Sequence, residues 1–590
     1  MSSSIGREAA LTVARHYYTT PVSYGFTDLE TAILAAFVTN VNRRVFLLLP
    51  LPPAAAATLG SMYSRLNNPR GLRGIIVDQF LPAALAGELT VVQQPPSEGG
   101  FGGDAEAFLR QYQIKNLAGL VAFSSAAAQL VQDFVNTGAA IAQQHRLLAN
   151  SSKCRRFLNT WLDAYGHNSI ARTGMVHICC EGISLLAAKS LEWNRPGSGF
   201  IELSTRYVNM QAAGLYPFED EVAAYLPVAG QIKGTSESNR SCFADYRRLA
   251  GTVFDGPLPA FYRERYASRF EPKDLERGIQ GETCDVLGNL LPAACLTSVF
   301  TAVSGEALPM LIKHLRQDQT AENEVLAELI VDECGLTGSD LFVRHTELLP
   351  GEVVGWGQAG PLRWVEQAEL ARLWLESKGE PCIRLFHYDS QINSCLDRVL
   401  SLRPFSLLGC PSGYYDITHD DQRDDHEKLP RDFESSVVWF VGLMSFRGWR
   451  DLQRMGMGTH RRTSFTPSFG FYRYPKPHPD CLDVCFARTA ERTADQYRQL
   501  VGSGIPPHLA QYLLPLGWQV GFEYGCNLRQ AEFGGWQRSK FTVNDEVRAV
   551  FTSMDRQLRE VCRIWSDVSR ADLTPHYIFA RTAAGVSLTD

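Results

Sequence analysis

The chain has 590 residues, and its 57 basic and 63 acidic side chains give a formal net charge of −6 at pH 7. This balance excludes binding to nucleic acid through a broadly basic surface, although a few local arginines could still hold an anionic nucleotide. The length allows two to four domains of ordinary size.

The distribution of cysteines and apolar residues predicts a soluble, cytoplasmic protein. The 14 cysteines form no Cys-x-x-Cys pair, which favours reduced thiols over a disulfide framework. Residues 1–18 lack the apolar core of a signal peptide. The apolar stretch at 32–59 is broken by polar residues and prolines, so we expect no membrane partner.

The first 165 residues read as one short strand followed mostly by helices. Residues 45–49 (VFLLL) are typical of a buried strand, and the prolines at 52 and 53 indicate a helix over 54–66. The glycine-rich stretch 98–103 predicts a flexible loop and a boundary. Residues 105–165 are helical in pattern.

A long apolar run at 169–191 leads into a Gly/Pro/Ser loop at 193–200 and then the stretch 201–207, IELSTRY. We expect Cys179 and Cys180, within the run, to lie on an apolar helix. Backbone amides, the Ser204 hydroxyl and the Arg206 guanidinium could wrap a phosphate. The alternative is a surface turn followed by a strand with a solvated arginine, which the residues alone favour.

The middle of the chain is less regular. Residues 209–275, rich in proline and tyrosine, predict an insertion with loops, and 287–315 predict two helices. Residues 382–388 predict a strand and 393–402 a helix. The acidic stretch 419–426 is better read as a solvated loop than as a metal site, because no ligand spacing repeats, and we expect no metal.

An internal repeat is the strongest organisational signal. Leu-Leu-Pro occurs at 290–292 and again at 513–515. An arginine and then a glutamate follow at nearly equal distances, as Arg316 and Glu324 in one copy and Arg538 and Glu546 in the other. The shared order favours duplication over chance similarity of two helical segments.

These motifs resemble the flavin-dependent thymidylate synthases (ThyX), whose signature is R-H-R-x-x-S-x-N-x-x-S-x-R-Y. Its second half is present as Ser204, Arg206 and Tyr207, preceded by a Gly-His-x-Ser element with His167 and Ser169. The first half of the signature is degenerate, because residues 194–196 (NRP) stand where R-H-R belongs.

The second copy resembles the family through other residues. Asn527 and Arg529 match its N-x-R element, and Arg538 follows nine residues after Arg529. Arg454 opens the segment that stands at the R-H-R position, and Glu434 stands where the family carries a flavin-contacting glutamate. The first copy has Arg172 at that place.

The resemblance implies an enzyme that methylates C5 of a pyrimidine nucleotide, dUMP by default, with FAD as cofactor and methylenetetrahydrofolate and NADPH as co-substrates. It implies that Arg538 is the catalytic residue, stabilising charge on the pyrimidine. The implied nucleotide-binding set is Glu202, Ser204, Arg206, Tyr207 and Arg538. The implied cofactor-binding set is His167, Ser169, Glu434, Arg454, Asn527 and Arg529. A kink near Gly534 and Gly535 would bring Arg529 and Arg538 together.

Two alternatives stay open. One is a relative acting on another pyrimidine nucleotide, by methyl or hydroxymethyl transfer. The other, favoured by the loss of R-H-R in both copies, is a non-catalytic descendant that binds nucleotide or serves as a scaffold.

The expected fold class is α+β, with two tandem ThyX-like domains related by a pseudo-twofold axis, each a small mixed or antiparallel sheet packed with long helices. The expected parts are an N-terminal extension (1–104), a first domain (105–340), a linker (341–380), a second domain (381–575) and a tail (576–590). Because the single-length family forms homotetramers, a duplicated chain predicts a homodimer. We also expect one composite nucleotide site between the copies, and a dead reciprocal site near Arg316 and residues 459–467.

Overall fold

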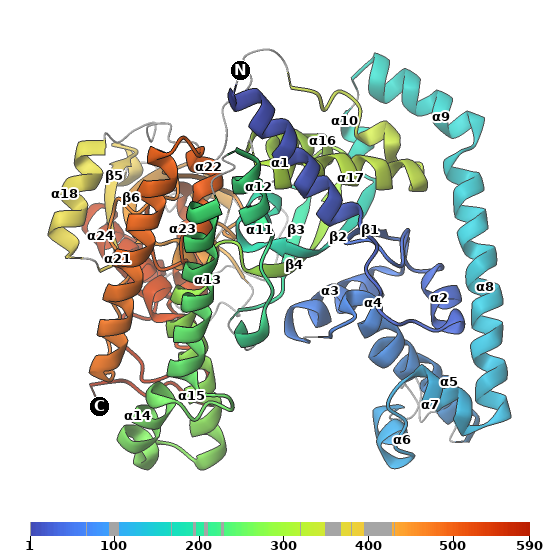
Figure 1. Ribbon diagram of the computed structural model, residues 1–590, viewed down its shortest axis with the longest axis horizontal. Coiled ribbons are helices and arrows are strands. Elements are labelled where there is room, and N and C mark those ends of the chain that lie inside the picture. The colour runs from blue at the N-terminus through green and yellow to red at the C-terminus, as the bar shows by residue number, and fades with distance from the viewer. Residues whose placement is uncertain are drawn as a thin grey trace, which may run out of the picture.

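The computed structural model describes residues 2–66, 68–93, 105–166, 168–192, 196–205, 210–225, 229–318, 320–348, 367–378, 380–393, 427–429 and 431–589. Two four-stranded antiparallel sheets organise the chain, with helices around them (Figure 1). This confirms the α+β class. Of the helices described here, none carries an apolar stretch long enough to cross a membrane.

The first sheet has the strand order β1-β2-β4-β3, and the second has the order β5-β6-β8-β7. The strands of the first are β1 (Val45–Leu48), β2 (Met175–Ser184), β3 (Ser198–Glu202) and β4 (Leu296–Ser304). Those of the second are β5 (Cys382–Tyr388), β6 (Val437–Ser445), β7 (Gly458–Arg462) and β8 (Gln519–Asn527). Strands β1 and β5 confirm two predictions from the sequence.

Corresponding helices follow corresponding strands. In the first half these are α11 (Leu185–Leu191) after β2, with α16 (Leu308–Gln317) and α17 (Ala321–Thr337) after β4. In the second half they are α20 (Phe446–Leu452) after β6, with α23 (Leu528–Ser539) and α24 (Asp545–Val561) after β8. The order of these elements is the same in the two halves, and the duplication itself stays a prediction.

The same kind of buried serine–glutamate pair anchors the helix that follows β2 and the helix that follows β6. Ser184 caps α11, and its hydroxyl donates to Glu322 of α17 at 2.6 Å. Ser445 caps α20, and its hydroxyl donates to Glu546 of α24 at 2.6 Å. Burial raises the pKa of both carboxyls, which their hydrogen bonds oppose.

The two Leu-Leu-Pro segments lie against each other. Pro292 bridges Pro515, the Ala293 amide donates to the Leu514 carbonyl at 2.9 Å, and the Leu516 amide donates to the Leu291 carbonyl at 2.9 Å. A twofold relation brings equivalent residues together in this way. The superposition of the two halves about such an axis remains a prediction.

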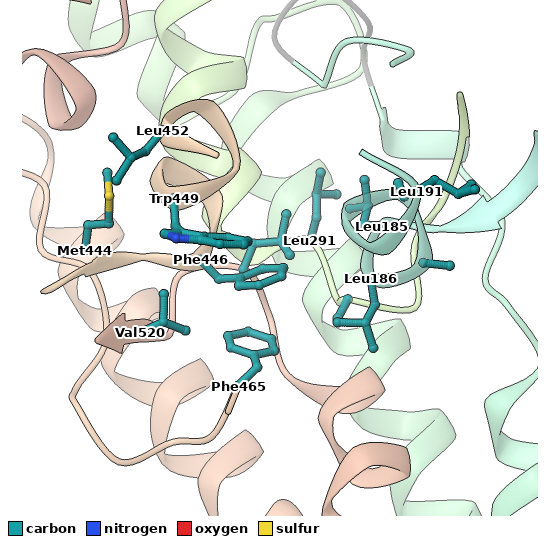
Figure 2. Packing of buried hydrophobic residues seen from close by; sticks show 14 of the residues in the cluster. Leu185, Leu186, Leu191, Leu291, Met444, Phe446, Trp449, Leu452, Phe465 and Val520 are labelled. Atoms are coloured by element: carbon teal, nitrogen blue, oxygen red, sulfur yellow. The ribbon is translucent and has the colours of Figure 1, made fainter. Parts of the chain in front are cut away.

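A single hydrophobic core joins the halves at this point (Figure 2). Leu185 and Leu186 of α11 approach from the first half, and Phe446 and Trp449 of α20 approach from the second. Trp449 is 1% exposed, and truncating a buried tryptophan costs about 3–5 kcal/mol. The halves are therefore held together by packing as well as by the chain.

Residues 209–275, expected to be loops, are largely helical, so that prediction was wrong. They hold α12 (Phe218–Tyr225), α13 (Ala229–Ala250), α14 (Pro257–Tyr266) and the start of α15 (Pro272–Leu287). Several of the prolines that suggested loops occupy the first turn of a helix, where no backbone hydrogen bond is lost. Helix α13 runs beside α21 (Asp480–Gly502) of the second half, and Arg488 contacts Asp245 at 2.6 Å (Figure 1).

Two other secondary-structure predictions were wrong. The first of the two helices expected in 287–315 is largely strand β4, whose sequence LTSVFTAVS is rich in β-branched residues. Cys179 and Cys180 lie on strand β2, not on a helix, and they face opposite sides of the sheet: Cys180 packs into the core that joins the halves, and Cys179 packs into the core of the N-terminal region. The twelve described cysteines are free thiols.

The N-terminal region is mostly helical and packs against the first half. Helix α3 (Pro53–Arg65) confirms the helix expected after the two prolines, and the helical pattern of 105–165 is also confirmed. Strand β1 pairs with β2, so residues before 104 complete the first sheet. The helices here are α1 (Ser2–Thr19), α2 (Asp28–Leu34), α4 (Gly71–Ile75), α5 (Leu81–Gln93), α6 (Ala105–Gln111), α7 (Leu117–Phe123), α8 (Ser125–Ala149), α9 (Ser152–Leu158) and α10 (Asn168–Ala171), with π-helical turns at Ile76–Phe80 and Asn159–Ala164.

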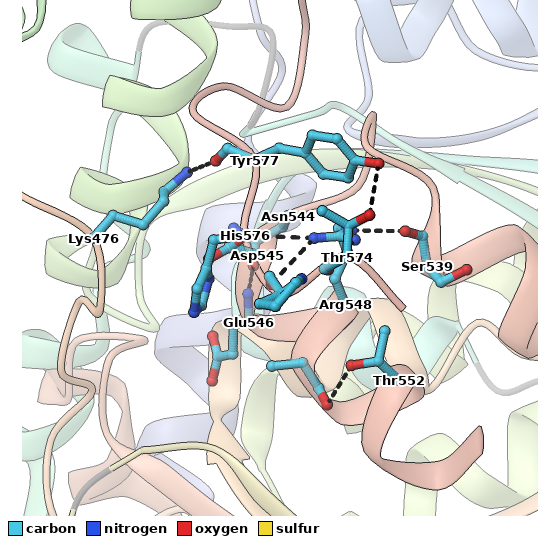
Figure 3. A network of polar contacts seen from close by, with 12 residues as sticks. Lys476, Ser539, Asn544, Asp545, Glu546, Arg548, Thr552, Thr574, His576 and Tyr577 are labelled. Atoms are coloured by element: carbon cyan, nitrogen blue, oxygen red, sulfur yellow. Dashed lines mark hydrogen bonds and ion pairs between the residues drawn. The ribbon is translucent and has the colours of Figure 1, made fainter. Parts of the chain in front are cut away.

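The C-terminal segment is tied to the second half by polar contacts (Figure 3). The Lys476 ammonium donates to the carbonyls of Tyr577 at 3.1 Å and Ile578 at 3.0 Å. Arg548 donates to the Thr574 carbonyl at 2.9 Å. Helices α18 (Gln367–Ser377), α22 (Pro507–Ala510) and α25 (Trp565–Val568) complete the second half.

Several predicted features lie outside the described residues. They are the loop at 98–103, the loop at 419–426, nearly all of the expected helix at 393–402, and residues 349–366 of the expected linker.

Candidate functional site

A compact ionic cluster lies where the two halves meet. Ser204 and Thr205 follow β3 of the first half and face α20 of the second, and a cavity of about 30 Å³ separates them. We define the interface cluster as Lys189, Glu192, Glu202, Arg450 and Arg454. The first three come from the first half, and the two arginines come from the second.

Glu202 is the centre of the interface cluster. Its carboxylate accepts hydrogen bonds from Lys189 at 2.9 Å, from Arg454 at 2.6 Å and from Arg450. Glu192 accepts from Lys189, and from Arg454 at 3.2 Å. Glu202, which the resemblance assigns to the nucleotide site, and Arg454, which it assigns to the cofactor site, are therefore in direct contact.

The electrostatics of the interface cluster favour the charged form of Glu202. Burial alone would raise the pKa of Glu202, which is 4% exposed, but Arg450, Lys189 and Arg454 lower it to about 2. Burial lowers the pKa of Lys189, and the two glutamates oppose that effect. Removing one partner from such a buried group costs about 3–5 kcal/mol, because the charges left behind are unpaired.

The spacing of charged residues explains why this end of α20 meets the first half. Arg447 and Arg450 are one turn apart on α20, and Arg454 follows just after the helix ends. Arg447 instead contacts Asp285 at 2.8 Å. Lys189 lies five residues after Ser184, and Arg450 lies five residues after Ser445. A basic residue at the same place in both copies of the repeat is a sequence signal that could have identified them. Neither they nor Glu192 had been predicted.

Arg538 lies next to the interface cluster rather than inside it. It is in the last turn of α23, and its Nε is 3.4 Å from the sulfur of Met455, the residue after Arg454. Helix α23 runs unbroken from 528 to 539, so the expected kink at Gly534 and Gly535 was wrong. Consequently Arg529 and Arg538, at opposite ends of the helix, contact different neighbours.

Arg529 and Asn527 mark the start of α23. The Asn527 side chain caps the helix by accepting from the Gln530 amide at 2.8 Å. Arg529 donates to Glu434 at 2.7 Å, so the two residues that the resemblance assigns to the cofactor are neighbours. The hydrogen bond from Arg529 lowers the pKa of Glu434.

The first half has the same pair with its charges exchanged. There Arg172 precedes β2 and contacts Glu306, which follows β4. The strand registers make Arg172 the counterpart of Glu434, and Glu306 the counterpart of Arg529. The start of α23 therefore carries a cation where the start of α16 carries an anion.

The remaining predicted residues are less informative. Ser169 is an exposed residue of α10. His167, Arg206 and Tyr207 lie outside the described residues. Arg316, assigned to the reciprocal site, contacts Thr346 at 3.1 Å and Glu347 at 3.0 Å.

The counterpart of Glu202 in the second half is Arg462, the last residue of β7. Its guanidinium lies 5.1 Å from the ring of Phe446 and 5.2 Å from that of Trp449. Burial lowers the pKa of Arg462 to about 10, an effect that Asp318 opposes. Asp318 bonds Ser190 of α11, and burial raises its pKa to about 6. The surroundings of Arg462 therefore differ from those of Glu202: they consist of aromatic rings and an aspartate instead of arginines and a lysine.

The fold and the cluster define a class: an α+β protein with two like-ordered sheets and an arginine-rich site between its halves. Residues 120–335 match the family described as thymidylate synthase complementing protein, so this part of the chain is similar to the ThyX family. The match lies within the first half and agrees with the resemblance drawn from the Ser-x-Arg-Tyr motif.

Uncharacterised proteins are similar over most of the chain. A UPF0159 protein of Chlamydia pneumoniae is 23% identical over 563 residues, covering 90% of this chain and 92% of that protein. One from Chlamydia muridarum is 24% identical over 576 residues, covering 90% and 93%. One from Thermoplasma acidophilum is 21% identical over 481 residues, covering 74% and 92%.

Proposed function

We propose that this protein binds a pyrimidine nucleotide between its two halves and methylates C5 of the base, with dUMP as the default substrate. The observation that carries the proposal is the meeting of two predicted parts. The loop with Ser204 and Thr205 comes from the first half, and Arg454 reaches it from the second.

The charge distribution supports an anionic ligand here. Ser204 and Arg206 would hold the phosphate, and Arg454 lies across the small cavity from Ser204. Arg538, beside Met455, would stabilise negative charge that develops on the pyrimidine oxygens as the ring is attacked. The reaction needs no cysteine nucleophile if a flavin relays the carbon and the hydride.

The start of α23 fits FAD better than its counterpart in the first half. Arg529 is 29% exposed at the N-terminal end of a 12-residue helix, an arrangement that favours an anionic group. Asn527, Arg529 and Glu434 would orient the cofactor, which would supply the hydride. Glu306 at the start of α16 would repel the same group. We therefore propose one flavin site per chain, with methylenetetrahydrofolate and NADPH as co-substrates.

The proposal predicts unequal effects of three arginine substitutions. Losing a bidentate arginine contact costs about 2–4 kcal/mol of binding, so Arg206→Ala and Arg538→Ala should each abolish measurable dUMP binding in calorimetry. Arg316→Ala, the matched control in the first half, should bind normally because Arg316 contacts Thr346 and Glu347. Arg316→Ala as the most damaging change would reject the composite site.

A second candidate, a non-catalytic nucleotide-binding or scaffold protein, is favoured by one observation. The cations of the interface cluster are already paired with Glu192 and Glu202. A related enzyme acting on another pyrimidine nucleotide, by methyl or hydroxymethyl transfer, would use the same site. The visible absorbance spectrum of the purified protein separates enzyme from scaffold, since bound flavin is yellow. Its absence, together with no dUMP binding, would reject the enzyme proposal.

A further inference from the structure

A large apolar chamber lies on the outer face of the first sheet, away from the core that joins the halves. Its volume is about 1230 Å³. Its walls come from β1 and α3, the C-terminal part of α8, and the end of α17. In Figure 1, α8 runs along the edge of the molecule beside these N-terminal elements.

The floor of the chamber is one row of residues that crosses all four strands. Leu48 of β1 pairs with His177 of β2, His177 pairs with Ala302 of β4, and Ala302 pairs with Gly199 of β3. All four line the chamber. A Cβ placed on Gly199 would meet no atom within 4 Å, so this part of the row faces open space.

The second half fills the equivalent space. The corresponding row holds Trp439 opposite Gly525, and Gly525 opposite Thr459. A Cβ on Gly525 would come within 2.7 Å of the Trp439 ring, so the tryptophan covers the glycine. The first half has His177 in place of Trp439, and the space stays open. The chamber is open to solvent, since Leu148 is 70% exposed and Leu336 is 54% exposed, and an exposed apolar surface of this size marks a binding site.

The polar groups of the chamber indicate which end of a ligand is charged. His177 stacks on Phe300 with 5.7 Å between ring centroids, and burial lowers the pKa of His177, so it is neutral at pH 7. His145 and Arg146 line the chamber from α8, and within the described ranges the Arg146 side chain forms no ion pair with a carboxylate. None of the described lining residues is acidic.

We propose that the chamber binds a long-chain carboxylate, with its apolar chain along the floor and its carboxylate at Arg146. The volume exceeds the range of about 300–1,000 Å³ that accommodates most drug-sized ligands, and the lining is mainly aliphatic. An arginine fork matches a carboxylate in geometry and charge. This inference does not depend on the proposed nucleotide chemistry.

The test is calorimetric titration of the full chain with palmitate and, as an uncharged probe of equal length, hexadecanol. We expect one palmitate per chain. Gly199→Leu and His177→Trp, the latter copying Trp439, should fill the chamber and lower palmitate affinity at least tenfold, with the thermal midpoint unchanged or raised. Arg146→Glu should weaken palmitate at least tenfold and hexadecanol little. Lys153→Glu, an exposed charge reversal on α9 that does not line the chamber, should change neither.

Several results would overturn the inference. The first is that the wild-type chain does not bind palmitate. The second is that Gly199→Leu and His177→Trp both bind palmitate as tightly as the wild type. The third is that Arg146→Glu loses the same affinity for palmitate as for hexadecanol. Sedimentation provides a further arm: if Gly199→Leu converts a dimer into a monomer, the chamber is covered by a second copy of the chain. If the filled variants fail to fold, the comparison of Arg146→Glu with Lys153→Glu decides the outcome.

Discussion

The two halves of this protein share one strand order but exchange their charges at corresponding places. The second half has Glu434 and Arg529 where the first has Arg172 and Glu306. The first half has Glu202 facing arginines, whereas the second has Arg462 near Asp318. Similar backbone architecture therefore supports two chemically different environments, only one of which offers arginines beside the Ser204 loop.

The largest difference in stability between matched substitutions in the two kinds of environment is expected at Glu202. Glu202→Gln leaves Lys189, Arg450 and Arg454 with a neutral partner in a buried place, so we expect the free energy of unfolding to fall by about 3–5 kcal/mol. Urea denaturation at pH 7 measures it. The matched variant Glu306→Gln, in a more exposed ion pair, should change stability far less. Equal losses of stability in the two variants would show that the buried interface cluster contributes no more than an exposed ion pair.

Lowering the pH should weaken the stabilisation contributed by Glu202 and strengthen that contributed by Asp318. The pKa of Glu202 is lowered to about 2, so its stabilisation is present above the unfolded value of 4.5 and is lost as pH falls toward 2. The pKa of Asp318 is raised from 3.8 to about 6, so its contribution is greatest below pH 3.8 and is lost as pH rises through 6.

A neutral replacement tests the second of these effects. Urea denaturation at both pH values gives the free energy of unfolding of Asp318→Asn relative to the wild type. This difference should favour the variant by about 2–3 kcal/mol more at pH 7 than at pH 4. A difference independent of pH would mean that Asp318 ionises normally.

Exchanging the charges of the Arg529–Glu434 pair sharpens the comparison at the proposed cofactor site. The double variant Glu434→Arg with Arg529→Glu keeps an ion pair but copies the charge order of the first half. Its fold should persist while flavin affinity falls about ten- to a hundredfold, measured by fluorescence titration with FAD. Exchange of Arg172 and Glu306 is the control. Loss of flavin in the control alone would place the cofactor in the first half.

The smallest effect is expected at Arg172. Its side chain is 66% exposed, and an exposed ion pair contributes little to stability. Arg172→Ala should therefore unfold at the same urea midpoint as the wild type, within experimental error. A clear drop would show that the pair fixes the start of β2.

The sequence predicted the parts of the fold that depend on local pattern. Strands at 45–49 and 382–388 and the helix after Pro52 were apparent because short apolar runs and prolines act locally. The helices of 209–275 were missed because prolines in a first helical turn resemble loop prolines. Strands β2 and β4 were missed because Cys179 and Phe300 on the outer face are buried as well as the apolar residues on the core face, which weakens the alternation that identifies a strand.

Of the residues at the candidate site, only those that stand at family-motif positions could be predicted from the sequence. Glu202, Ser204 and Arg454 were identified by motif position, and Arg529 and Glu434 proved to be neighbours. Lys189 and Glu192 were not found, because a buried lysine is recognised only once the fold places carboxylates around it. The chamber was also invisible in the sequence, since it results from His177, Gly199 and Ala302 lying in one row across three strands.

The pairing of Pro292 with Pro515 has a consequence for how such an interface can change. Between identical subunits an isologous surface must be self-complementary, so one substitution alters both copies of a contact. Within a single chain the two sides mutate separately, and covalent linkage keeps their effective concentration high even when the protein is dilute. Glu202 and Arg462 can therefore hold opposite charges at corresponding places, and one site can specialise without a matching change in the other.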